Sequence, residues 1–249
     1  IYFLIDISRS MEKAEDLQPN RLAVAKKEMK DFREGLEGDY EFAIVPFAGD
    51  ASSYYFVPSA SAAAFVEAVD ELNGDLISEG GTDLTSAFIG LKQMMDGFGF
   101  HQEEVNLAVL LSDGGKEESF AIDRQALRKA IDKVSKLGFK VYALGVGGLQ
   151  STPLVERGEN GEFSSYRKDE VTGQTMYSML DENILKSVAN WGQGRYFLFK
   201  KAGDLGAHLT SIVEENRQFK EKRISYQTVS LRFWFFFSAI IIFFLGRGK

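Results

Sequence analysis

Three short segments of the sequence carry oxygen-bearing side chains in patterns that suit a hard metal ion. The first places a carboxylate and two hydroxyls at alternate positions, Asp6, Ser8 and Ser10, directly after an apolar run. The second offers the hydroxyl of Thr82 after two glycines, and the third offers Asp113 after another apolar run. Oxygen ligands without nitrogen or sulfur suit Mg²⁺, Mn²⁺ or Ca²⁺. The sequence therefore predicts a divalent-cation site built from these five residues.

This mix of ligands favours binding over turnover. Two carboxylates balance a divalent ion, and if hydroxyls and water make most of the direct bonds, the ion keeps an open position. An Asp or Glu from a partner protein is then able to complete the coordination. Nothing in the motifs suggests a general base or a nucleophile, so we expect no enzymatic activity. Two alternatives stay open: a structural scaffold subunit of a membrane complex whose metal site is non-functional, and a metal-dependent hydrolase.

Each motif has a plainer explanation when it is taken alone. Asp and Ser favour helix caps and turns, and Asp-Gly is a common turn dipeptide. The segment Ser10-Met-Glu-Lys13 fits the S-x-x-K pattern of penicillin-binding enzymes, but the chain contains no K-T-G sequence. The metal-site interpretation therefore depends on all three motifs together.

Composition excludes several other classes of function. The chain of 249 residues has no cysteine and two histidines, which excludes thiolate chemistry, disulfides and histidine-rich metal sites. The net charge is −7, yet residues 217–249 hold seven basic residues against one acidic residue. The preceding body is therefore strongly acidic, and we expect no nucleic-acid binding because phosphate affinity depends on clustered Lys and Arg.

Apolar runs alternate with amphipathic stretches, which predicts a doubly wound α/β fold for residues 1–216. We expect a mostly parallel central sheet with helices on both faces. In such sheets ligands bind where loops leave the carboxyl ends of the strands, and the three motifs fall there. The predicted strands are 1–5, 40–47, 53–57, 105–111, 139–146 and 195–199, and the predicted helices are 20–36, 62–72, 84–98, 123–137, 181–191 and 203–222.

A glycine-rich and polar stretch, residues 147–180, is predicted to contain a small β-hairpin insertion at about 160–180. Its predicted strands are Phe163–Arg167 and Thr175–Met179. We expect the hairpin to lie near the loops at the strand ends, as a partner-binding edge or as an inert insertion.

The end of the chain differs in composition from the body. Residues 217–230 form a basic juxtamembrane segment, and 231–246 are predicted to be a transmembrane helix, since Ser238 is the only polar residue between Phe233 and Leu245. That apolar stretch alone rises about 20 Å as a helix, less than the hydrocarbon core of about 30 Å. A helix that crosses the membrane must therefore include residues before Phe233. A buried core helix or strand is the alternative.

The beginning of the chain also bears on the membrane. Ile1 lies inside an apolar run and is not an initiator methionine. We therefore expect residues upstream of Ile1, such as another membrane span. Basic residues flank the C-terminal apolar segment on both sides, so the positive-inside rule leaves its orientation open.

The three motifs, in this order and on these elements, resemble the metal-ion-dependent adhesion site of von Willebrand factor A domains. The resemblance covers roughly residues 1–216 and implies a Rossmann-like fold. It implies that the three hydroxyl residues of the motifs are direct or near-direct ligands, and that the two carboxylates act directly or through water. One departure is Gly115, which follows Gly114 where the family often has an acidic residue.

Further segments resemble the bacterial BatA/BatB, or aerotolerance, branch of that family. These segments are Asn20–Glu28, Val45–Asp50, Gly80–Leu84, Leu110–Gly114, Leu180–Glu182, Gly194–Phe197 and the terminal apolar helix. The resemblance implies a domain anchored in the bacterial inner membrane and placed on its periplasmic or extracytoplasmic side. It implies partners among other Bat-type proteins and a MoxR-type AAA ATPase system, with one protein partner supplying the Asp or Glu.

Overall fold

The longest apolar runs form the buried centre of a seven-stranded sheet. These strands are β1 (Tyr2–Asp6), β2 (Phe42–Ala48), β5 (Asn106–Ser112) and β6 (Phe139–Val146), which pair in parallel. Their burial on both faces explains why they read as continuous apolar runs rather than as alternating ones. β11 (Gln193–Phe199) pairs in parallel with β6, and the order across the sheet is β11-β6-β5-β1-β2-β3.

Two short antiparallel strands complete the edge beside β2. They are β3 (Ala51–Ser52) and β4 (Phe56–Ser59), and both pair with β2. The prediction of one strand at 53–57 is therefore wrong. Gly49 adopts a φ of +54°, so the chain reverses at once and pairing resumes at Ala51.

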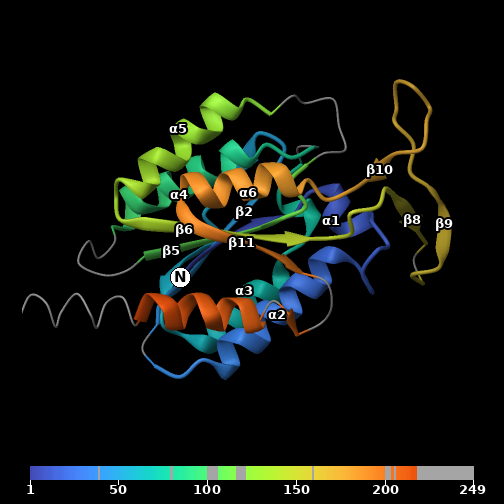
Figure 1. The fold of residues 1–249 in the computed structure, drawn as a ribbon. Coiled ribbons are helices and arrows are strands. Elements are labelled where there is room, and N and C mark those ends of the chain that lie inside the picture. The colour runs from blue at the N-terminus through green and yellow to red at the C-terminus, as the bar shows by residue number, and fades with distance from the viewer. Residues whose placement is uncertain are drawn as a thin grey trace, which may run out of the picture. The chain divides into compact units, whose positions relative to one another are not determined.

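Helices cover both faces of the sheet, as the doubly wound pattern predicts (Figure 1). α2 (Arg21–Gly35) and α3 (Ala62–Glu71) lie on one face. α4 (Leu84–Phe98), α5 (Arg124–Ser135) and α6 (Glu182–Trp191) lie on the other. Each of these five helices begins at an Asn, Ser or Asp whose side chain accepts from a backbone N–H of the first turn, which explains where they start.

The sheet separates two cores of different composition. Leu4 and Val45 face a mainly aliphatic core formed with α4, α5 and α6, in which aromatic residues are the minority. Phe3, Phe42 and Phe65 form an aromatic group on the α2–α3 face, with the ring centroids of Phe42 and Phe65 5.0 Å apart. Both faces therefore hold the sheet rigidly beneath the loops at its carboxyl edge.

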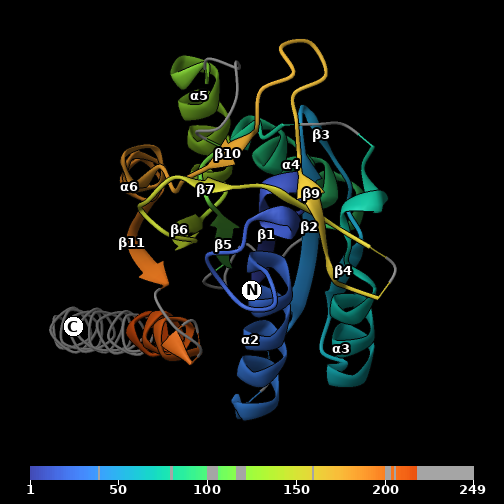
Figure 2. The same ribbon diagram turned by 90° about the vertical axis from the view of Figure 1, so that its right-hand side faces the viewer.

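The glycine-rich stretch forms an arm, which we define as residues 149–179. β8 (Val155–Arg157) pairs antiparallel with β9 (Phe163–Tyr166), and β7 (Thr152–Pro153) pairs antiparallel with β10 (Tyr177–Ser178). Figures 1 and 2 show the arm at the end of the sheet where α1 also lies.

The predicted pairing within the arm holds only beside its turn, where Met176 N–H donates to Arg167 O at 2.9 Å. Phe163–Arg167 was expected to pair with Thr175–Met179, but β9 pairs with β8 instead. Between the expected strands the bridge Lys168–Thr175 and its neighbouring hydrogen bonds remain, which makes that part a local turn. The physical reason is burial: Leu154 and Val155 are almost fully buried, and this anchored segment provides β9 with a fixed partner.

The computed structural model describes residues 1–38, 40–78, 81–99, 106–115, 122–158, 160–199, 203–204 and 206–217. Ile1–His208 form one compact unit, and the described part of a second unit, residues 209–217, is helical. None of the helices in these ranges combines the length and the apolar character that crossing a bilayer requires. The predicted segments 217–230 and 231–246 lie outside the described residues, apart from residue 217 at the end of the helix.

Candidate metal centre

Two of the three motifs leave neighbouring strands at the same edge of the sheet. β1 and β5 are parallel partners, with Ile5 opposite Leu111. The residues that follow, Asp6 and Ser112, therefore meet at the carboxyl edge although they are far apart in the chain. Both are fully buried.

Asp6 is held by hydrogen bonds to both carboxylate oxygens. Its Oδ1 accepts from the backbone N–H of Ser8 at 2.9 Å, and its Oδ2 accepts from the hydroxyl of Ser112 at 2.6 Å. Because the carboxylate is fixed on each side, its remaining lone pairs have a set direction. The alternate spacing of the first motif thus has a local cause, namely a turn in which Asp6 binds the amide two residues later.

The two serines of the first motif lie side by side. The helix α1 (Arg9–Lys13) begins after Ser8, which makes no side-chain capping hydrogen bond, so its hydroxyl turns to Ser10 instead. The distance from Ser8 Oγ to Ser10 Oγ is 3.0 Å, and both residues are more than nine-tenths buried.

Thr82 comes from a loop that is fixed to the end of β2. Thr82 forms a parallel bridge with Gly49, and Asp83 N–H donates to Gly49 O at 2.8 Å. The loop also packs against the third motif, because a Cβ on Gly115 would lie 2.8 Å from Thr82 Cβ. The structure thus places Thr82 beside the loop that carries Asp113.

Asp113 is fully buried and bound on both oxygens. Its Oδ1 accepts from Gly115 N–H at 3.0 Å, and its Oδ2 accepts from Arg21 Nη1 at 2.6 Å and from Ser178 Oγ at 3.2 Å. The Arg21 and Ser178 contacts were not predicted from the sequence. Asp113 is therefore already paired with a positively charged side chain, that of Arg21.

Arg21 also forms an ion pair with a second acid, Asp16. Its Nε and Nη2 donate to the two oxygens of Asp16 at 2.8 and 2.7 Å, and Asp16 also accepts from Gly148 N–H. A Cβ on Gly147 would lie 2.7 Å from Arg21 Nε, so the chain needs a glycine there. The hydrogen bonds and charge of Arg21 lower the pKa of Asp16, although burial alone would raise it.

The sequence does contain a signal for Arg21 that the sequence analysis missed. Arg21 follows the capping residue Asn20 and falls on the same helix face as Ala25, Glu28 and Phe32, all of which are buried. Charged residues at core-facing positions of an amphipathic helix are rarely fully buried without a partner. Asp16 and Ser178 have no comparable local pattern, since their roles arise from the fold.

The electrostatics of the site are dominated by buried negative charge. Arg21 pairs with Asp16 and Asp113, whereas Asp6 accepts hydrogen bonds only from the uncharged groups Ser8 N–H and Ser112 Oγ. Burial raises the pKa of Asp6 to about 7, and the negative charge of Asp113 contributes to the rise. A cation bound beside such a buried carboxylate would stabilise its ionised form.

The donor set fits a small divalent ion. Two ligands at right angles on an octahedral Mg²⁺, each about 2.1 Å from the ion, are about 3.0 Å apart. Ser8 Oγ and Ser10 Oγ are hydrogen-bonded to each other at 3.0 Å, so both could bind such an ion with little change in their separation. Over the described ranges, no three His, Asp or Glu side chains gather in a way that could hold a metal ion. A cation here would therefore rest on hydroxyl oxygens together with Asp6 and Asp113.

The arm is tied directly to the segment that carries Ser10. Lys13 pairs with Glu156 at 3.1 Å, and a backbone bridge joins Ala14 to Leu154. A polar cavity of about 270 Å³ lies between the residues that follow Ser10 and strand β8. The arm therefore forms a wall next to the candidate site.

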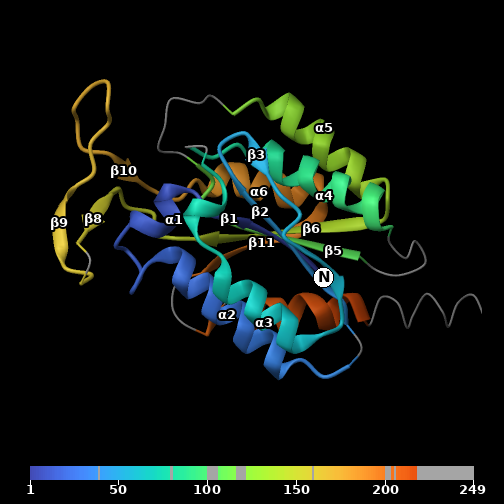
Figure 3. The same cartoon turned by 180° about the vertical axis from the view of Figure 1, so that it is seen from behind.

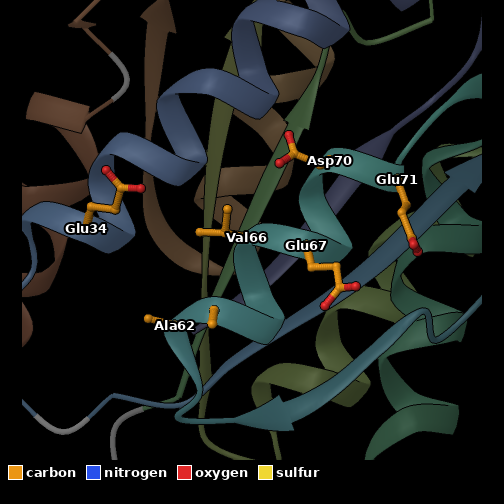
Figure 4. Close-up of a pocket in the computed structure, with 7 residues that line it drawn as sticks. Glu34, Ala62, Val66, Glu67, Asp70 and Glu71 are labelled. Carbon is orange, nitrogen blue, oxygen red and sulfur yellow. The ribbon is translucent and has the colours of Figure 1, made fainter.

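A larger groove lies elsewhere on the surface. It has a volume of about 530 Å³ and is formed by α2 and α3, with Val66 on its apolar lining. Figure 4 shows Glu34 on α2 and Glu67, Asp70 and Glu71 along α3 around this groove. None of the five predicted ligands lines it, so its chemistry is separate from the candidate metal centre.

Comparisons with known proteins agree with the fold. Residues 1–116 match the family model of the von Willebrand factor type A domain. That range contains all five predicted ligands. No curated protein matches the chain.

Solved structures extend the likeness over most of the chain. The conserved hypothetical protein BatB from Bacteroides thetaiotaomicron is 22% identical, with a TM-score of 0.75 over 87% of this chain and 98% of that one. An aerotolerance-related membrane protein from Bacteroides fragilis is 23% identical, with a TM-score of 0.71 over 86% and 98%. A von Willebrand factor type A protein from Catenulispora acidiphila is 19% identical, with a TM-score of 0.54 over 88% and 41%.

The predicted resemblance to von Willebrand factor A domains is confirmed by the family match, and the resemblance to the BatB and aerotolerance-related proteins is confirmed by the shared fold. Residues 1–116 carry a von Willebrand factor type A domain match, and the chain has the fold of the BatB and aerotolerance-related proteins.

Proposed function

We propose that this protein is a membrane-anchored, divalent-cation-dependent protein-binding module. Mg²⁺ is the expected ion, with Mn²⁺ as its closest substitute. Ser8, Ser10 and Thr82 provide hydroxyl oxygens, while Asp6 and Asp113 provide charge directly or through water. The observation that carries the proposal is that the buried hydroxyls of Ser8 and Ser10, hydrogen-bonded to each other at 3.0 Å, lie on the loop whose first residue is the fixed carboxylate Asp6.

The chemistry supplied by the ion is attraction for a carboxylate. Neutral hydroxyl ligands leave more positive charge on the ion than carboxylate ligands do, so an Asp or Glu of a partner protein is an effective further ligand. Among this chain's residues, Asp6 holds the charge at the centre, and the serines set the spacing.

The expected setting is a membrane-bound assembly. One structural relative is named as a membrane protein, and the apolar segment 231–246 offers an anchor in this chain. We propose a position on the outer side of a bacterial inner membrane, with other Bat-type proteins and a MoxR-type ATPase system as associates. The contacts of the arm with Lys13, Ala14 and Asp113 support a partner-binding surface beside the candidate site.

The deciding experiment uses the full chain in two stages, first purified in detergent and then in its native membrane. Isothermal titration of the purified, detergent-solubilised chain with MgCl₂ measures cation binding. Affinity capture after crosslinking in membranes, with Mg²⁺ or with EDTA, then measures partner binding. We expect saturable Mg²⁺ binding and a partner set that is lost with EDTA.

Two variants make the experiment specific. Asp6→Ala removes the central carboxylate and is expected to abolish both signals. Glu67→Ala removes an exposed acid in the α2–α3 groove and is expected to leave both unchanged. Equal capture from wild type, Asp6→Ala and EDTA-treated membranes would reject cation-dependent binding and favour a scaffold whose site is non-functional.

A further inference from the structure

Asp113 is bound to an internal cation before any metal arrives. Arg21 is fully buried, and its Nη1 lies 2.6 Å from Asp113 Oδ2 and 2.5 Å from Ser178 Oγ. The Ser178 hydroxyl also donates to the same carboxylate oxygen at 3.2 Å. Both lone pairs of that oxygen are thus engaged by the protein.

The other oxygen of Asp113 faces the motif loops. It accepts one hydrogen bond, from Gly115 N–H, which leaves it one lone pair. Asp113 is therefore turned so that its charge is shared between Arg21 on one side and the candidate site on the other. A metal ion at the site must compete with a guanidinium for the same carboxylate.

We propose that Arg21 is a positioning residue that weakens divalent-cation binding by neutralising Asp113. This inference rests on the proposed function. A fixed cation near a bound cation raises the energy of the loaded site, because like charges repel most strongly where water is excluded. The ion is then held loosely by this chain alone, and a partner's carboxylate contributes a larger share of the total binding.

A purely structural role for Arg21 predicts the opposite result. If Arg21 served only to hold Asp113 in place, its removal would loosen the ligand and weaken Mg²⁺ binding. Charge competition predicts that removal tightens Mg²⁺ binding, even while the metal-free protein becomes less stable. The sign of the change in Mg²⁺ affinity therefore separates the two roles.

The test uses a paired substitution, Arg21→Gln with Asp16→Asn, in the full chain. Removing both members of a buried ion pair is better tolerated than removing one, because no uncompensated charge is left at Asp16. Titration with MgCl₂ is expected to give a Kd at least about threefold lower than that of wild type. Thermal unfolding is expected to show a lower Tm without Mg²⁺ and a larger rise on adding it.

A matched control sits on the same helix. Lys27 and Asp31 form an exposed ion pair on α2, and Lys27→Gln with Asp31→Asn likewise replaces one basic and one acidic residue by amides without touching Asp113. This control is expected to leave the Kd for Mg²⁺ unchanged. A Kd that falls equally in both paired variants would overturn the proposal, since the effect would then be general.

A second variant covers the case in which the Arg21 pair does not fold. Asp16→Asn removes the acid that balances Arg21 but keeps the Arg21–Asp113 contact, so charge competition predicts Mg²⁺ binding weaker by about twofold, whereas a role in holding Asp113 predicts no change. If wild type binds Mg²⁺ and the paired variant binds it equally or more weakly, or Asp16→Asn binds it equally or more tightly, the role of Arg21 is wrong while the proposed function stands. If wild type binds no Mg²⁺, the proposed function fails and this inference fails with it.

Discussion

The hydroxyl of Ser112 donates to Asp6 Oδ2 at 2.6 Å, across 106 positions of the chain. This contact exists because β1 and β5 are neighbours in the sheet and end at the same level. It fixes the carboxylate at the centre of the candidate site before any ion binds. The same bond ties the first motif to the third, so the site is a property of the sheet rather than of one loop.

Neutralising Asp6 should raise the stability of the metal-free protein and abolish its response to Mg²⁺. Asp6→Asn removes a buried charge that is repelled by Asp113, and we expect a higher Tm than wild type at pH 8 without Mg²⁺. The same variant should lose the rise in Tm that Mg²⁺ gives to wild type. Thermal unfolding by circular dichroism, with and without MgCl₂, measures both effects.

The control for this prediction is Asp123→Asn. Asp123 is the exposed capping residue of α5, and Asn caps helices about as well as Asp. This variant should unfold like wild type and keep its response to Mg²⁺. If Asp6→Asn retained the full response to Mg²⁺, Asp6 would not be a ligand.

Acid should displace the cation because protons and Mg²⁺ compete for Asp6. The pKa of Asp6 is raised from 3.8 to about 7, with burial as the main cause. Below pH 7 the carboxyl is increasingly protonated, so the apparent Mg²⁺ affinity should fall by up to about tenfold per pH unit. Titration calorimetry between pH 5.5 and 8 measures this slope, and an affinity that stays flat over that range contradicts the assignment.

The metal-free protein should respond to pH in the opposite sense. Because the folded state holds its proton more tightly than the unfolded chain does, the contribution of Asp6 to stability is fully present below pH 3.8. It is lost progressively as the pH rises towards about 7. In EDTA, Asp6→Asn should therefore gain stability relative to wild type between pH 4 and 7 and keep a constant advantage above that.

Ion size should decide among the divalent cations. The Ser8 and Ser10 hydroxyls are 3.0 Å apart, which suits ligands at about 2.1 Å from an octahedral ion. Ca²⁺, with ligands at about 2.4 Å, needs a wider spacing and more ligands. We expect Mg²⁺ and Mn²⁺ to bind more tightly than Ca²⁺ in calorimetric titrations, and a site that prefers Ca²⁺ would contradict an octahedral arrangement on these two hydroxyls.

The strand and helix pattern of the sheet could be predicted from local sequence because burial on both faces produces continuous apolar runs. β6 and α4 match their predicted ranges, Phe139–Val146 and Leu84–Phe98, residue for residue. Periodicity fails where pairing is decided by distant contacts. The arm shows this, since β9 pairs with β8 because Leu154 is anchored in the interior, and nothing in the segment itself reveals that.

The residues of the candidate site also fall into two groups, those that local sequence predicts and those that it does not. Residues that follow strands directly, such as Asp6 and Asp113, are visible in the sequence because a strand end places them at the sheet edge. Other residues reach the site only through the tertiary fold: Arg21 lies at the start of α2, Asp16 precedes that helix, and Ser178 lies at the end of the arm. Such contacts bring together segments up to 157 positions apart and leave no spacing that a sequence motif could encode.

The close packing of Gly115 against Thr82 gives the last prediction. Gly115 has a φ of +67°, and a Cβ there would lie 2.8 Å from Thr82 Cβ. Gly115→Ala should therefore destabilise the protein by more than about 1 kcal/mol and also weaken Mg²⁺ binding, because Thr82 must move. Gly99→Ala is the matched comparison: its φ is +75°, yet no atom lies within 4 Å of the added Cβ.

The two alanine variants share backbone strain and differ in what the new methyl group meets. We expect Gly99→Ala to lower the free energy of unfolding by about 1 kcal/mol in urea titrations while leaving the Kd for Mg²⁺ unchanged. Only Gly115→Ala should raise that Kd. If Gly115→Ala bound Mg²⁺ as wild type does, Thr82 would lie outside the coordination of the ion, and the site would rest on the first motif and Asp113 alone.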